Sequence, residues 1–368
     1  MKLSVDQVER EVAHLWEEEA RKSGAARVEL LTLVALVSEP QLLERAEKVL
    51  ADVVKGVPCR TIVAVWRDGA EPAITADASL HRVAPGGPAC GDAITLEAIG
   101  EAREWIPGNA DRLALSDLPV CIWWVGDLPD HDDLFDRMVV NADVVIVNSQ
   151  EMDLRDLEKL SSIAQRSRGR YALADLAWAR LRWVQDLVAR FFDDEQGRAC
   201  LPGLERIDIE FSPRDGEKDA TSTRSGLLFG WLAHVLKLPT DSPQWKRGDT
   251  WAEVRLGDVL TRFEQRPQKG VRPGGIVRLA IQCKTGRFEI QRQEDPQAFR
   301  WSREVPGAPT PPQLLRVLSL DEPTLLLRCL ERPKRDPLLE TSLQVGSRIV
   351  RPVAPRLSRL PPPAPTSS

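Results

Sequence analysis

Histidine and tyrosine are scarce in this chain of 368 residues, which has four of the first and one of the second. No histidines stand at HxxxH or HExxH spacing, which argues against a zinc enzyme. No apolar run approaches the roughly 20 residues that span a bilayer, so no membrane segment is expected. The acidic, amphipathic start of the chain also lacks the apolar core of a signal peptide, and we therefore expect a cytoplasmic protein.

Paired cysteines are absent as well. The six cysteines lie far apart and form no CxxC motif; they are Cys59, Cys90, Cys121, Cys200, Cys283 and Cys329. In a chain of this size such spacing indicates reduced thiols and not a disulfide framework.

The sequence also lacks the usual phosphate-binding and nucleophile motifs. After the first predicted strand it reads Val37-Ser38-Glu39-Pro40-Gln41, where a dinucleotide-binding fold would carry GxGxxG. There is no GxxxxGK[ST] loop and no GxSxG elbow. These absences argue against a dinucleotide or nucleoside-triphosphate enzyme, and no cofactor is expected.

Strand-forming segments alternate with amphipathic helices over the first 200 residues. Residues 28–37 and 59–66 are rich in strand formers, and residues 41–54 between them place their apolar side chains on one helical face. This arrangement predicts a right-handed crossover between parallel strands. A first helix is expected after a capping box of Ser4 and Gln7. Residues 73–83 are expected as a strand or hairpin arm, and residues 119–125 and 142–148 as strands. Further helices are expected at 132–140, 154–166 and 172–192. The prediction is an α/β domain with a mostly parallel, Rossmann-like layered sheet.

The pattern changes after Gly197. Short strand candidates are separated by polar, proline-rich loops, at 207–211, 251–256, 275–283, 287–293 and 325–330, with one helix at 225–236. The sequence therefore predicts two domains: an α/β domain over 1–197 and a smaller α+β domain with an antiparallel sheet over 198–350. The proline- and serine-rich residues 351–368 are expected to be a disordered tail.

The two halves differ in charge. The net charge of −5 combines −12 over residues 1–200 with +7 over residues 201–368. Two soluble domains with different solvated faces would explain this difference, and so would domains that hold each other or a partner electrostatically. The positive half has no dense Lys/Arg stripe with interleaved aromatics, so nucleic-acid binding is not expected.

Loops that follow the predicted strands would line a ligand cleft at the carboxyl edge of the sheet, where open α/β folds bind ligands. The candidates are Ser38, Gly126, Asp127, Asn148 and Ser149. Beside them, His131 is surrounded by acidic residues, namely Asp127, Asp130, Asp132 and Asp133. This cluster could hold a divalent cation, or it could be a polar loop whose carboxylates favour a helix start.

Tryptophan is abundant, with 11 residues. Trp123 and Trp124 are adjacent in a predicted strand, so we expect one on each face of the sheet. Tryptophan is common both in cores and at interaction hot spots, and both roles are open for these residues.

Several segments in order resemble the OpcA-type family of glucose-6-phosphate dehydrogenase assembly proteins. They are Pro58-Cys59-Arg60-Thr61-Ile62-Val63, a stretch from Cys90 to Ala98 with Asp92 where the family usually has Glu, Leu118-Pro119-Val120-Cys121-Ile122-Trp123-Trp124, the run from Ala142 to Ser149, and Asp175-Leu176-Ala177-Trp178-Ala179-Arg180-Leu181. The resemblance implies a non-catalytic partner that binds the dehydrogenase and promotes its active oligomer or raises its activity. It also makes Trp124 and Arg180 candidate partner contacts. A sugar-phosphate- or nucleotide-binding enzyme or sensor that uses the cleft, and a scaffold for another enzyme, are the alternatives.

Overall fold

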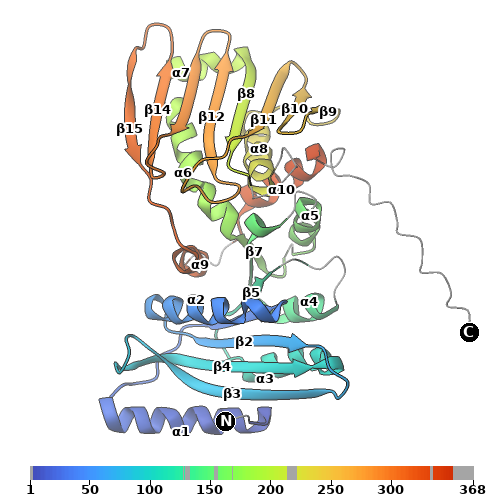
Figure 1. The fold of residues 1–368 in the computed structure, drawn as a ribbon, viewed down its shortest axis with the longest axis vertical. Helices are drawn as coiled ribbons and strands as arrows, with labels where there is room; N and C mark the ends of the chain where they lie inside the picture. Colours follow the sequence, from blue (N-terminus) through green and yellow to red (C-terminus); the bar gives the residue numbers. More distant parts are fainter. Residues whose placement is uncertain are drawn as a thin grey trace, which may run out of the picture.

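The computed structural model contains two β-sheets that follow one another along the long axis of the molecule (Figure 1). It describes residues 3–126, 128, 133–152, 156–167, 169–213, 222–331 and 335–350. The predicted tail at 351–368 lies outside the described residues. None of the helices in the described part of the chain has the length and apolar character that a bilayer span requires.

The first sheet has seven strands in the order β3-β4-β2-β1-β5-β6-β7. Every neighbouring pair is parallel except β3 with β4, which confirms the predicted α/β class. The strands are β1 (Thr32–Val37), β2 (Arg60–Arg67), β3 (Ala73–Arg82), β4 (Ala89–Ile99), β5 (Val120–Val125), β6 (Val144–Val147) and β7 (Ala172–Asp175). The exposed Val28 and Leu30, predicted as strand, precede β1.

Helices lie on both faces of this sheet. They are α1 (Val5–Ser23), α2 (Leu43–Gly56), α3 (Ile106–Leu113), α4 (Asp133–Met138), α5 (Asp156–Arg166) and α6 (Leu176–Phe191), with short 3-10 turns at Pro40–Leu42, Gly100–Trp105, Val139–Asn141 and Ser149–Glu151. Helices α2, α3, α4 and α5 connect its strands, α1 precedes β1 and α6 follows β7. The capping box is confirmed: the Ser4 backbone N–H donates to Gln7 Oε1 at 3.1 Å. The helix predicted at 172–192 is wrong in its first turn, because Ala172–Asp175 pair with β6 as the last strand.

The second sheet has eight strands in the order β15-β14-β13-β12-β8-β11-β10-β9, all antiparallel except the β8–β11 pair. They are β8 (Leu204–Phe211), β9 (Gln244–Arg247), β10 (Trp251–Leu256), β11 (Val259–Gln265), β12 (Ile276–Cys283), β13 (Arg287–Arg292), β14 (Ala298–Glu304) and β15 (Thr310–Arg316). The mostly antiparallel sheet is confirmed. The strand predicted at 325–330 is wrong: it lies in α9 (Glu322–Glu331).

The two halves are packed together by elements that contact both. Helix α6 leaves the first sheet and packs on the second, where Phe191 stacks on Trp301 at 4.9 Å between ring centroids. In the other direction, α9 packs against α2, and Arg45 forms an ion pair with Glu322 at 2.8 Å. Helices α8 (Thr223–Val235), α10 (Pro337–Val350) and α5 pack on one another, and a short α7 (Glu195–Cys200) precedes β8. All strands of the first sheet precede residue 197, but the division into domains stays a prediction.

A buried charge network fixes α1 on the first sheet. Asp92 of β4 is fully buried and accepts hydrogen bonds from Trp16 Nε1 at 2.6 Å, from Arg27 at 2.6 Å and from Arg60 Nε at 2.9 Å. Arg60 itself is only 1% exposed and also pairs with Glu9 of α1. A buried charge is tolerated only when it is paired and hydrogen-bonded. Helix α1, the segment before β1 and strand β2 supply the partners of Asp92.

His81 beside this network predicts a loss of stability in acid. The Thr61 hydroxyl donates to the Asp92 carbonyl, and its oxygen lies 2.8 Å from His81 Nε2. Since the hydroxyl proton is already used, neutral His81 donates its Nε2–H to Thr61 Oγ1. Burial lowers the pKa of His81 to about 4. Because this folded-state pKa lies below the unfolded value, the stability it contributes is present above pH 6.5 and is lost as the pH falls toward 4.

As the pH falls from 6.5 to 5, the unmodified chain should lose about 1–2 kcal/mol of its free energy of unfolding through His81. We expect His81→Gln not to show this loss. Burial raises the pKa of the nearby Glu29 to about 7, which acts in the opposite direction and makes the variant comparison necessary. Urea unfolding at several pH values measures the difference. Parallel pH profiles for the two chains would contradict the assignment to His81.

Candidate functional site

The predicted cleft at the carboxyl edge of the first sheet is partly closed by its own residues. The backbone N–H and the hydroxyl of Ser38, after β1, both donate to the Val125 carbonyl of β5, at 3.1 and 3.0 Å. Gly126 has φ of +107°, and a Cβ on it would lie 2.1 Å from Ser38 Oγ. The structure thus brings Ser38 and Gly126 together, but the hydrogen bonds of Ser38 join the end of β1 to the end of β5.

Asn148 and Ser149 serve the next connection. Ser149 is fully buried, and its backbone N–H and hydroxyl donate to the Asp175 carboxylate at 3.0 and 2.6 Å. Asp175 also accepts from Ala177 N at 3.0 Å and so caps α6. Asn148 is 7% exposed, and its Oδ1 has no hydrogen-bond partner among the residues that the structure describes.

Most of the predicted acidic cluster lies outside the described residues. This holds for Asp127, Asp130, His131 and Asp132, while Asp133 begins α4. Within the described ranges, no group of three or more His, Cys, Asp or Glu side chains is placed to hold a metal ion.

The tryptophan pair lies on opposite faces of the sheet, as predicted. Trp123 belongs to the core beneath α2, while Trp124 packs among Trp66 and Phe135, with centroid distances of 6.4 and 5.3 Å. Trp124 is 1% exposed. In this structure it supports the core, and any effect on a partner would be indirect.

The predicted contact residue Arg180 has a different setting, because it lines a cavity of about 710 Å³ between α6 and the second sheet. The walls come from α6, the loop before β12, the β13–β14 turn and the segment that leads from β15 to α9. Seven arginines and one acidic residue, Asp295, line it; the arginines are Arg180, Arg182, Arg224, Arg272, Arg292, Arg316 and Arg328. We call this space the arginine cavity.

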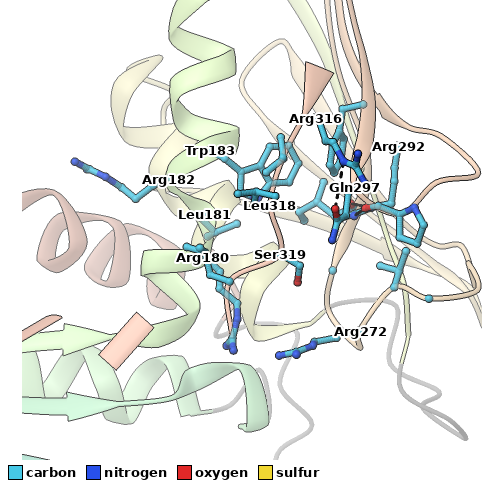
Figure 2. Close-up of a pocket in the computed structure, with 18 of the residues that line it drawn as sticks. Arg180, Leu181, Arg182, Trp183, Arg272, Arg292, Gln297, Arg316, Leu318 and Ser319 are labelled. Carbon is cyan, nitrogen blue, oxygen red and sulfur yellow. Dashed lines mark hydrogen bonds between the residues drawn. The ribbon is translucent and has the colours of Figure 1, made fainter. Parts of the chain in front are cut away.

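Figure 2 shows how these side chains are arranged. Arg180 and Arg272 extend toward one region at the bottom of the view, Arg292 and Arg316 lie at the upper right, and Arg182 points away. Trp183 and Leu318 lie to the left of Arg292 and Arg316 and above the ends of Arg180 and Arg272. The cavity therefore combines positive charge with an apolar wall.

The positive charges of the arginines repel one another, and this repulsion contributes to a lowered pKa of the buried Arg224. Arg224 is 8% exposed, and burial together with the charges of Arg180, Arg292 and Arg272 lowers its pKa to about 9. Burial also lowers the pKa of Arg292 to about 10. Both side chains remain cationic at neutral pH, so the lining residues that the structure describes carry a net positive charge.

No local motif could have revealed this cavity. Its arginines come from segments between residues 180 and 328 that only the tertiary fold brings together. The one signal in the sequence was the positive charge of the second half.

The cysteines were predicted correctly: all six are free thiols, and burial raises the pKa of Cys59, Cys121, Cys283 and Cys329 to about 12.

Comparison with known proteins places the chain in a family. Residues 51–165 match the family described as the glucose-6-phosphate dehydrogenase subunit N-terminal domain, and residues 171–343 match the corresponding C-terminal domain. The chain belongs to the OpcA family. The resemblance found in the sequence is thereby confirmed, and it extends over the second half, where the motifs were weak.

Two curated relatives carry the name OxPP cycle protein OpcA. The relative from Synechocystis sp. is 26% identical over 229 residues, which cover 60% of this chain and 46% of the relative. The relative from Nostoc punctiforme is 29% identical over 201 residues, which cover 52% and 41%. This OpcA-family chain thus matches less than half the length of either relative.

The fold also resembles that of a solved oxidoreductase from Sinorhizobium meliloti. The TM-score is 0.50 at 12% identity, with 87% of this chain and 97% of the other covered. At this identity the likeness concerns the fold alone.

Proposed function

We propose that this chain binds glucose-6-phosphate dehydrogenase and promotes its active oligomer or raises its activity, without a catalytic step of its own. The observation that carries the proposal is the match of both halves to domains described as subunits of that dehydrogenase. Because the match to the curated relatives covers less than half of their length, the partner and the activity are proposals for this chain.

The first sheet supports a role in binding over one in dinucleotide chemistry. In a dinucleotide-binding fold, glycines after the first strand let the pyrophosphate approach the following helix. Here that turn carries Ser38, Glu39 and Pro40, and Ser38 is bonded to the end of β5. Ser149 is buried and donates to the Asp175 carboxylate. Ser38 and Ser149 at this edge therefore serve the fold.

A ligand-binding sensor is the second candidate. The arginine cavity favours it, because a concave cluster of cations beside aromatic rings suits a phosphorylated compound. This candidate moves the predicted ligand site from the strand ends of the first sheet to the space between α6 and the second sheet. Both functions can reside in one chain.

Titration of the purified chain into its cognate dehydrogenase tests the main proposal. A protein that binds the active state more tightly than the other states shifts the population toward it. We expect a defined complex by mass, and a change of about 5-fold or more in turnover or in apparent substrate affinity. An unrelated protein of similar size and charge is the control. Neither a complex nor a kinetic change at micromolar concentrations would refute the proposal.

A further inference from the structure

The arginine cavity contains a buried cationic group whose hydrogen-bonding capacity is not met. Arg224 at the start of α8 is more than nine-tenths buried, and its Nε has no hydrogen-bond partner in the described part of the chain. A buried guanidinium N–H without an acceptor is costly, and native proteins leave few such groups unless a ligand or water completes them.

The acceptor that Arg224 does reach is a neutral amide oxygen, which it shares with a second arginine. Gln150 donates its amide to the Pro273 carbonyl at 3.0 Å, which turns its Oε1 toward the arginines. That one oxygen accepts from Arg180 at 2.8 Å and also from Arg224. A neutral oxygen satisfies a donor of Arg224 but does not balance the charge of its guanidinium group. An anionic oxygen in the same region would do both.

The rest of the lining suits a carbon ring. Trp183 and Phe299 contact each other at 4.2 Å between centroids, and the Arg292 guanidinium lies 4.3 Å from the Phe299 ring. Leu318, in the segment after β15, is 70% exposed although it borders the cavity. Apolar surface beside fixed cations is typical of sites for small organic ligands, and about 710 Å³ is within their usual size range.

We infer that the arginine cavity binds a phosphorylated small molecule, whose phosphate group lies against Arg180, Arg224 and Arg272 and whose ring packs on Trp183 and Leu318. The guanidinium fork binds phosphate oxygens in pairs, which matches the converging donors. The arginines surround one concave space, which favours a small molecule over an extended polyanion that would need a stripe of charge along the surface. This inference is independent of the proposed action on the dehydrogenase.

Calorimetric titration of the full chain, in buffer without phosphate, tests the inference. The probes are glucose 6-phosphate and AMP, each compared with its unphosphorylated counterpart, glucose or adenosine, and with inorganic phosphate. We expect at least one phosphorylated probe to bind with a Kd of about 1 mM or tighter, and its counterpart to bind at least about 10-fold more weakly. Arg224→Gln and Arg180→Gln should each weaken binding by about 10-fold or more.

Arg190→Gln is the matched control, because Arg190 is exposed on the same helix as Arg180 but does not line the cavity. Arg180 is a second, half-buried position, so the test does not depend on the folding of the Arg224 variant. No binding by any phosphorylated probe at about 10 mM would overturn the inference. So would binding that both cavity variants leave unchanged, or binding of a polyglutamate peptide alone. The dehydrogenase titration is read out by complex mass, so the two proposals can fail separately.

Discussion

Asp92→Ala is expected to lower the free energy of unfolding by about 3 kcal/mol or more, because it leaves the Arg60 guanidinium buried without its main counter-ion. Asp92 accepts from α1 through Trp16, from Arg27 before β1 and from Arg60 of β2. Its removal therefore takes an acceptor from the buried Trp16 and Arg60 side chains, while the partly exposed Arg27 keeps its ion pair with Glu29. Glu9 can compensate in part, but it is 52% exposed and its pairing with Arg60 is weakened by solvent.

Urea unfolding followed by tryptophan fluorescence measures this loss, and Asp68→Ala, at an exposed position after β2, is the control. Asp92→Asn keeps one acceptor oxygen, but it replaces the other with an amide NH2 donor and removes the charge, so we expect a loss between those of the other two variants. Equal stability of Asp92→Ala and Asp68→Ala would show that the network does not hold α1 on the sheet. The network gives the Asp92 carboxylate of this segment a structural role.

The parts of the fold that the sequence predicts correctly are those set by local pattern. The alternation of apolar strands with amphipathic helices gave the parallel sheet, since each crossover has one handedness. Adjacent Trp123 and Trp124 had to lie on opposite faces because side chains alternate along a strand. The capping box of Ser4 and Gln7 located the first helix.

Two short segments were assigned the wrong type because their local preference and their tertiary setting disagree. Residues 172–175 contain the helix formers Ala and Leu, but strand pairing with β6 determines their conformation. Residues 325–330 form an apolar run that periodicity cannot assign to strand or helix. The better signal lay before it, where Asp321 accepts from the Thr324 N–H at 3.0 Å and caps α9.

The candidate site was predictable only in part. Ser38, Gly126, Asn148 and Ser149 do follow parallel strands at one edge, as the topology requires, but Ser38 is hydrogen-bonded to the end of β5 and Ser149 to Asp175. Arg180 was singled out for its motif, and the structure adds arginines that are up to 148 positions away in the sequence. Such convergence depends on long-range packing, which local patterns do not specify.

Gly230→Ala is expected to destabilise the chain by about 1–3 kcal/mol, because helices α8 and α10 cross at this residue with almost no space between their backbones. A Cβ on Gly230 would lie 2.3 Å from the Ser342 carbonyl oxygen and 2.9 Å from Gly346 N. Those atoms belong to the backbone of α10, so no side chain can move aside and the helices must separate. Alanine gains about 1 kcal/mol of helix propensity over glycine, which offsets only part of the cost.

Gly108→Ala is the matched control for this prediction. Gly108 also lies inside a helix, α3, but a Cβ there would meet no atom within 4 Å. We therefore expect this variant to gain up to about 1 kcal/mol from propensity alone. Opposite signs for the two substitutions in urea unfolding would isolate the steric effect at the helix crossing. A gain for both would mean that α10 does not pack this closely on α8, and that residues 337–350 are less tightly held to the second half of the molecule than the structure has them.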